Sequence, residues 1–262
     1  MKGILLPSLN LASKWADKVI IYDNESTNGT WGNVKELALS NSKIVPFKHD
    51  NEPYADGVRA EIFNSFKNEW VDGDWWGIQD SDEIYRGNPR KFISEQIGCF
   101  HYINGKKVDF SFDLNKTEDI RFTGDFEVDL KHITHFSPYA WSEPRMIKHR
   151  KNLKWEKDKI WPTHMGIVCE NTIEIKHYPL RSANQIHLRW LTRRKTKERG
   201  GQYFQHWEQE TWQEYYLKKA EGLEAFDSVN RVFENVCFAN NPKQSYVKKL
   251  VKYILHGLRI LP

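Results

Sequence analysis

Long apolar runs are missing from this 262-residue sequence. No stretch approaches the roughly 18 consecutive apolar residues of a membrane-spanning helix. The apolar patch from Gly3 to Pro7 also lacks the longer apolar core and small-residue cleavage site of a secretory signal. We therefore expect neither a membrane span nor secretion, and we predict a cytoplasmic protein.

Cysteine is scarce, and repeats and low-complexity linkers are missing. Cys99, Cys169 and Cys237 are odd in number and widely spaced, whereas zinc sites and disulfide frameworks use close pairs. We expect reduced, buried thiols. The length suffices for one sizeable core. We predict a compact domain over residues 1–200 and a helical C-terminal extension over residues 201–262.

Net charge is modest, with 39 Lys and Arg against 35 Asp and Glu. The basic residues nevertheless concentrate in two segments, Arg181–Arg199 and Lys243–Arg259. Such clusters indicate an anionic partner on that side of the molecule. Phosphate groups, nucleic acid and anionic lipid would all satisfy this pattern.

Strand-like and helix-like segments alternate in the first part of the chain. Short apolar runs at Lys18–Tyr22, Lys43–Phe47 and Trp75–Gln79 predict strands. Helical spacing follows the second run over Ala55–Trp70, and Pro89 suits the first turn of a further helix. This alternation predicts an α/β fold with a largely parallel sheet flanked by helices.

The pattern changes after Cys99. Shorter strand-like pieces up to Tyr178 suggest an antiparallel half, and the chain then becomes helical. The predicted helices are Ala183–Lys197, Tyr203–Leu223 and Gln244–Leu258. The last carries lysines beside an apolar stripe, which fits either a solvated terminal helix or an anchor on a membrane surface.

Acidic residues follow two of the predicted strands. Asp23 begins the turn DNESTNGT, and Asp80 and Asp82 lie in DSDE after the strand WWGIQ. Ligands of open parallel sheets bind at the carboxyl ends of strands, so we expect these residues to face one cleft. Two carboxylates at i and i+2 can share Mn²⁺ or Mg²⁺ with substrate phosphate oxygens. Solvated loop residues are the alternative interpretation.

A third stretch, KHYPLRSANQIHLR, places His177 at the end of a predicted strand and Arg181 just before a helix. Helix N-termini with arginine are natural phosphate sites. His177 suits a metal ligand or a hydrogen-bond donor to phosphate, and an ordinary core or surface histidine is the alternative.

Together VIIYDNESTNGT, DWWGIQDSDEIY and KHYPLRSANQIHLR resemble the family 2 glycosyltransferases and their GT-A relatives, over roughly Leu5 to Gly200. The resemblance implies a GT-A, Rossmann-like fold preceded by a first strand that this chain does not contain. It implies an inverting enzyme that transfers sugar from a nucleotide sugar to a glycan or lipid-linked acceptor, as in polysaccharide biosynthesis.

The resemblance also assigns roles to residues. Asp23 matches the donor nucleoside position, and Asp80 and Asp82 match the diphosphate and metal positions, which makes Asp82 a catalytic candidate. His177 would join the metal site, and Arg181 would close over the donor phosphates. A further arginine, on the helix before the acidic strand, would also contact the donor; this is Arg59, for which an ion pair with Glu61 or Asp56 is the alternative.

Inverting transfer needs a carboxylate that deprotonates the acceptor hydroxyl. We predict Glu143 for this role because Trp141 and Arg145 beside it suggest a shaped pocket, and a structural salt bridge between Glu143 and Arg145 competes with it. Other carboxylates in the same section are Asp113, Asp125, Glu127 and Asp129.

Two other functional classes stay open. A metal-dependent phosphoesterase or nuclease would use similar acidic and basic groups, but it needs a second metal set that the sequence does not show. A non-catalytic protein would bind carbohydrate or nucleic acid through aromatic and basic residues. Acidic residues at two strand ends argue against nucleic acid in that cleft.

Overall fold

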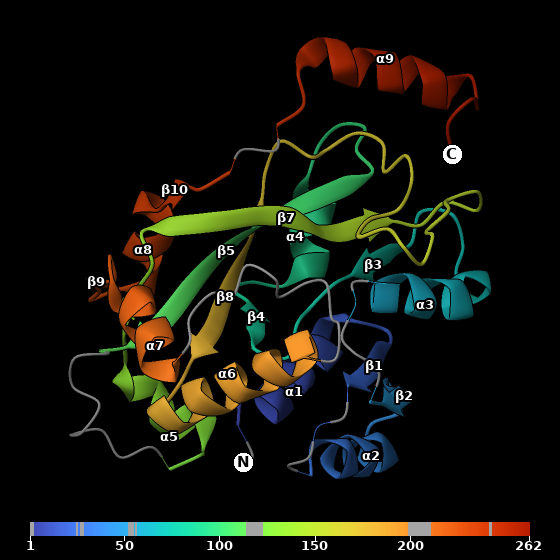
Figure 1. The fold of residues 1–262 in the computed structure, drawn as a ribbon. Coiled ribbons are helices and arrows are strands. Elements are labelled where there is room, and N and C mark those ends of the chain that lie inside the picture. Colours follow the sequence, from blue (N-terminus) through green and yellow to red (C-terminus); the bar gives the residue numbers. More distant parts are fainter. Residues whose placement is uncertain are drawn as a thin grey trace.

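The computed structural model describes residues 3–24, 26, 29–51, 55, 57–113, 123–198, 211–240 and 243–262. In these ranges the chain forms a two-stranded sheet and an eight-stranded sheet with helices packed around them (Figure 1). No helix in the described ranges is both long enough and apolar enough to cross a bilayer.

The N-terminal part contains the predicted alternation of helices and strands. Its elements are α1 (Leu5–Trp15), β1 (Val19–Asn24), α2 (Thr30–Ser40), β2 (Ile44–Asp50), α3 (Gly57–Phe66) and the 3-10 turn η1 (Lys67–Glu69). β1 and β2 pair in parallel as a separate small sheet. Leu9, Val34 and Ile44 are buried beneath it, so this unit has a small core of its own.

The larger sheet is built from the middle and end of the chain. Its strands are β3 (Trp75–Gly77), β4 (Glu83–Tyr85), β5 (Tyr102–Phe112), β6 (Ile133–Phe136), β7 (Tyr139–Lys148), β8 (Ile173–Leu180), β9 (Glu224–Ala225) and β10 (Cys237–Phe238). They run in the order β10-β7-β5-β6-β9, with β3 beside β7 and with β8 between β4 and β5. The β5–β8 and β10–β7 pairs are parallel, and the other described pairs are antiparallel.

The predicted mostly parallel, Rossmann-like GT-A sheet is therefore wrong. The alternating segments build only the two-stranded sheet, because β3, expected as its continuation, pairs antiparallel with β7 and places Trp75 opposite Lys148. The segment predicted as a smaller antiparallel half, Cys99–Tyr178, supplies the main sheet. Its long strand β5 is buried along most of its length. Joining the sheet that contains β5 and β7 therefore buries more backbone and apolar surface of the three-residue strand β3 than extending the two-stranded sheet would.

The remaining helices begin at recognisable capping residues. They are α4 (Pro89–Glu95), α5 (Phe126–Asp129) with the 3-10 turn η3 (Leu130–His132), α6 (Ala183–Glu198), α7 (Trp212–Ala220), α8 (Val229–Asn235) and α9 (Tyr246–Gly257). Asn88 caps α4 by accepting the Arg90 and Lys91 N–H groups ahead of the predicted Pro89 start, and Ser245 caps α9 by accepting the Lys248 N–H.

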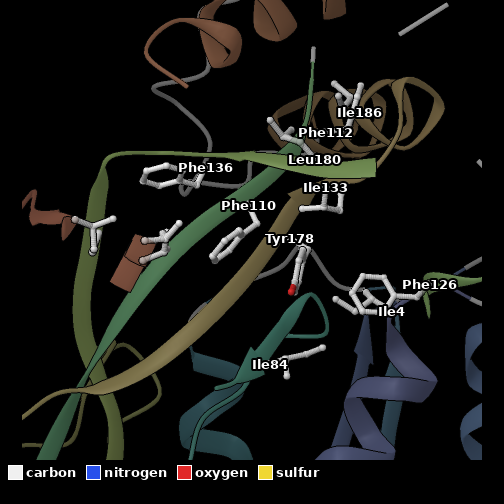
Figure 2. Close-up of a cluster of buried hydrophobic side chains, with 14 of the residues drawn as sticks. Ile4, Ile84, Phe110, Phe112, Phe126, Ile133, Phe136, Tyr178, Leu180 and Ile186 are labelled. Carbon is white, nitrogen blue, oxygen red and sulfur yellow. The ribbon is translucent and has the colours of Figure 1, made fainter. Parts of the chain in front are cut away.

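The main core lies where the large sheet meets the C-terminal helices. Phe110 from β5 and Tyr178 and Leu180 from β8 converge there (Figure 2). Val232 and Phe233 from α8 are buried in the same cluster. The described residues 211–240 thus share the core and the sheet of the residues before them, and the predicted boundary between residues 200 and 201 lies outside the described residues.

A buried histidine, His101, predicts acid sensitivity of the fold. Its Nδ1 accepts the Ile167 N–H at 3.1 Å, and burial together with the positive charges of Arg150 and His256, and of nearby lysines, lowers its pKa from 6.5 to about 3. As the pH falls, His101 is therefore protonated at a higher pH in the unfolded chain than in the folded protein. Stability from His101 is complete above about pH 6.5 and is lost as the pH falls, by about 2 kcal/mol at pH 5.

Urea unfolding at neutral pH and at pH 5 would measure this loss. We expect His101→Gln to be less stable than the wild type at neutral pH, because the buried contact is altered, but to lose less stability on acidification. An identical loss in both proteins would contradict the assignment to His101.

Candidate active site

The predicted acidic segment forms a tight turn between β3 and β4. The Glu83 N–H donates to the Asp80 carbonyl at 3.0 Å, and the Asp80 N–H donates to Glu83 Oε2 at 3.0 Å. The Tyr178 N–H of β8 donates to the Asp82 carbonyl at 2.9 Å. These bonds hold Asp80 and Asp82 on one rigid turn beside β8.

Asp82 points into a cluster of cationic groups from β8 and α6. Its Oδ2 accepts a hydrogen bond from Arg189 Nη1 at 2.9 Å, and Arg181 Nη1 lies 4.0 Å from the same oxygen. Its Oδ1 is 3.5 Å from His177 Nε2, while His177 Nδ1 lies 2.6 Å from Asp109 Oδ1. The predicted residues Asp82, His177 and Arg181 are therefore neighbours.

The titration of this cluster follows from its charges. Burial alone would raise the pKa of Asp82, but His177, Arg189 and Arg181 lower it well below its ordinary value. Burial alone would lower the pKa of His177, but Asp82 and Asp109 raise it to about 9. In this arrangement Asp82 is ionised and His177 is protonated at neutral pH.

Asp80 belongs to a second cluster, centred on Arg145 of β7. Arg145 Nη2 donates to Glu83 Oε1 at 2.7 Å and to Glu143 Oε1 at 2.5 Å, and its Nη1 lies 3.8 Å from Asp80 Oδ2. Arg145 and Glu83 are fully buried, whereas the Asp80 side chain is 46% exposed. Asp80 is thus the carboxylate of the turn that solvent and ligands can reach.

Glu143, the predicted base, is held by two cations. Arg145 donates to it, and Lys107 Nζ lies 3.2 Å from its Oε1. Burial would raise the pKa of Glu143, but Arg145, Lys107 and Arg59 lower it. The competing salt bridge with Arg145 is present, and the catalytic role of Glu143 stays a prediction.

Two of the other carboxylates of the middle section, Asp125 and Asp129, have structural contacts. Asp125 caps α5 by accepting the Glu127 and Val128 N–H groups. Asp129 accepts the backbone N–H groups of Thr123 and Gly124. These contacts explain both residues through local turn geometry.

Arg59 of α3 reaches the acidic turn. Its Nη2 lies 3.9 Å from Asp80 Oδ1, and its guanidinium lies over the Trp161 ring, 5.0 Å from the centroid. Of the two alternative partners, Glu61 pairs with Lys48, and Asp56 lies outside the described residues. This geometry places Arg59 beside Asp80, while donor contact stays a prediction.

Asp23 lies in a separate group at the end of β1. Its Oδ1 accepts from the Ser26 hydroxyl at 2.6 Å, and its Oδ2 lies 2.9 Å from His49 Nδ1 of β2. The His49 ring stacks on Trp31, with centroids 5.3 Å apart. Among the described residues, no hydrogen bond or ion pair joins Asp23 to the acidic turn.

Sequence reasoning gave no role to several members of the site. Asp109 faces His177 only because β5 and β8 pair in that register, and a register between distant strands leaves no local signal. The ion pair between Glu83 and Arg145 likewise depends on the sheet. Arg189 stands in the same basic stretch as His177 and Arg181, and that position was the available signal.

The carboxylates of the acidic turn and His177 differ in whether they can hold a divalent cation. Asp80 fits, because it offers an exposed, hard carboxylate to a cation that keeps most ligands from phosphate and water. Asp82 already accepts from Arg189, and protonated His177 has both ring nitrogens directed at carboxylates. Within the described residues, no three His, Cys, Asp or Glu side chains are grouped as a metal site. Metal roles for Asp82 and His177 stay predictions that require these pairs to open.

Comparison with known proteins adds no assignment: no protein-family model matches the chain, and no curated protein matches it.

Proposed function

We propose that the chain is a glycosyltransferase that takes a sugar from a nucleotide diphosphate sugar and transfers it to a glycan or lipid-linked acceptor. The observation that carries this proposal is the set of arginines around the acidic turn. Four guanidinium groups lie within 4.0 Å of the Asp80 or Asp82 carboxylates, those of Arg59, Arg145, Arg181 and Arg189.

Arginines in this number suit a ligand with several negative charges. Arg145 Nη1 and Arg189 Nε are buried donors that have no hydrogen-bond partner among the described residues. A buried N–H without a partner costs about 1–3 kcal/mol, and phosphate oxygens would satisfy such donors with charge-assisted bonds. A departing diphosphate is an anion of this kind.

Each of these residues has a separate role in the proposed reaction. Arg59, Arg181 and Arg189 bind the diphosphate of the donor, and Asp82 holds Arg189 and His177 in place. Asp80 would hold Mn²⁺ or Mg²⁺ together with the diphosphate, and the cation would neutralise charge on the leaving group. Protonated His177 would donate to the same leaving group once its Nε2 turns from Asp82.

Glu143 is proposed as the base that accepts the proton of the acceptor hydroxyl. Glu143→Gln removes the proton acceptor with little change in shape, so we expect turnover to fall about 10²- to 10⁴-fold while donor binding persists. Donor titration and steady-state kinetics on the same preparation would separate these effects. Unchanged turnover would remove Glu143 from the mechanism and leave it as a partner of Arg145.

Incubation with UDP-, GDP- and dTDP-sugars and manganese tests the function directly. We expect one donor to release its nucleoside diphosphate, detected by chromatography, with the sugar recovered on an acceptor or on water. Cleavage of simple phosphate esters without any donor turnover would instead support a phosphoesterase. Metal-independent binding of oligonucleotides alone would support a nucleic-acid-binding protein.

A further inference from the structure

Helix α9 docks on the rest of the chain through its polar side. Lys249, Lys252 and His256 contribute an ion pair, a hydrogen bond and a ring contact to the domain. Lys249 pairs with Glu170, and the His256 ring lies 4.2 Å from the His101 ring, centroid to centroid. A solvated surface helix normally does the reverse and directs its charged side to water.

The opposite side of α9 is apolar and faces outward. Its residues are spaced at helical intervals along one face and are between 46% and 68% exposed; they are Val247, Leu250, Val251, Ile254 and Leu258. Figure 1 shows α9 at the edge of the fold, away from α1 and α6. A continuous apolar face of this kind marks an interaction surface.

The surroundings of this face extend it and add positive charge. Ile97 is almost fully exposed and lines a groove with Phe100, Leu250 and Tyr253 of the same region. Lys248 is exposed at the side of the face, and the helix contains lysines but no Asp or Glu. The surface is therefore apolar at its centre and basic at its border.

We propose that this face of α9 docks on an anionic phospholipid bilayer. An interfacial helix of this type inserts its apolar side among the acyl chains and keeps lysines near the lipid phosphates. Tyr246 and Tyr253, both exposed, suit the boundary between headgroups and acyl chains. Docking would hold the enzyme at the membrane surface, and it does not depend on the reaction proposed above.

Charge decides between a bilayer and a second copy of the chain. Two-fold pairing of this face with itself would bring the exposed Lys248 of two α9 helices together, with no acidic residue in either helix to offset it. An anionic bilayer offers the opposite charge.

Vesicle co-sedimentation of the full chain tests the proposal, with phosphatidylcholine vesicles that contain or lack phosphatidylglycerol. We expect binding to the anionic vesicles that weakens as salt is added. Val251→Glu combined with Ile254→Glu should reduce this binding at least about tenfold. The two apolar side chains that would enter the bilayer are replaced by negative charges, which the anionic lipid surface repels.

Leu39→Glu combined with Val71→Glu is the matched control. These side chains are 90% and 70% exposed on other elements, so the same change of charge is made outside the proposed face. We expect this variant and Asp80→Asn to bind vesicles as the wild type does. Circular dichroism on every variant would check that the fold is kept.

Two results would overturn the proposal. The first is failure of the wild type to bind anionic vesicles, or equal binding by the Val251→Glu, Ile254→Glu variant. The second is a dimer in light scattering that only this variant dissociates, without vesicle binding by the wild type, which would make the face an interface between copies of the chain.

Discussion

Replacing Arg145 by methionine should lower the free energy of unfolding by about 3–5 kcal/mol, the usual cost of removing one partner of a buried ion pair. Arg145 and Glu83 are fully buried and joined by a 2.7 Å hydrogen bond. Burial raises the pKa of Glu83, and Arg145 opposes that rise. Without Arg145, the Glu83 carboxylate must either stay charged in the core with only Lys107 Nζ, 3.5 Å away, beside it, or take up a proton.

Urea unfolding of Arg145→Met, Glu83→Gln and the double variant would measure this coupling. We expect the double variant to be more stable than the sum of the single losses predicts, because the uncompensated charge is gone. Arg90→Met is the control, since Arg90 pairs with Asp17 at an exposed site and should change stability by about 1 kcal/mol or less. Additive single losses would contradict a direct interaction between Arg145 and Glu83.

Asp80→Asn and Asp82→Asn should differ in their effects on stability and activity. Asp80 is half-exposed and reaches Arg59 and Arg145 only at 3.9 and 3.8 Å, so its loss should spare the fold. On the proposed function, it should lower kcat/KM about 100-fold or more, because charge on the leaving diphosphate is no longer balanced.

Asp82→Asn should lose stability as well as activity. The low pKa of Asp82 means that its ionised form stabilises the folded state at neutral pH. The uncharged amide would remove the carboxylate that accepts from Arg189 and would leave His177 with Asp109 as its charge partner. Thermal unfolding together with kinetics would separate the two variants. Asp17→Asn, at a 71% exposed carboxylate, is the matched control. Equal loss of stability in Asp80→Asn and Asp82→Asn would contradict the distinction.

Local patterns predicted most of the secondary structure. The apolar β-branched run Lys18–Tyr22 corresponds to β1, Pro89 is the first residue of α4, and the predicted last helix corresponds to α9. Of the predicted helix Tyr203–Leu223, α7 falls within the described residues and the beginning lies outside them. Capping residues and hydrophobic spacing act within a few residues of each other, so one sequence is enough to read them.

Strand pairing could not be predicted in the same way. Trp75 pairs with Lys148 and Asp109 with His177, and the partners of each pair are far apart in the sequence. The sequence of a short strand is similar in parallel and antiparallel sheets. The strand at Trp75–Gln79 was therefore wrongly predicted to continue the parallel sheet. Pairing depends on total burial across the sheet, which periodicity does not report.

The candidate site was also predicted only in part: its residues could be chosen from the sequence, but their partners from distant segments could not. Residue type, position near strand ends and helix starts, and the family resemblance selected Asp80, Asp82, His177 and Arg181. The structure makes Asp82 a neighbour of His177 and Arg181 and puts Asp80 on the same turn as Asp82. The partners that set their protonation come from other strands and helices. Asp23 was expected in the same cleft on the assumption of a continuous parallel sheet. It contacts His49 in the small sheet, and its place in one cleft with the acidic turn stays a prediction.

Thermal stabilisation by nucleotides tests the proposed diphosphate site at the acidic turn. Purified protein would be heated with UDP, GDP, dTDP or CMP, each with and without manganese, beside Asp80→Asn and Asp17→Asn. We expect one nucleoside diphosphate to raise the melting temperature of the wild type and of Asp17→Asn in the presence of manganese, and we expect Asp80→Asn to lose this rise. Stabilisation by CMP alone, or by no nucleotide at all, would contradict a diphosphate site at the acidic turn.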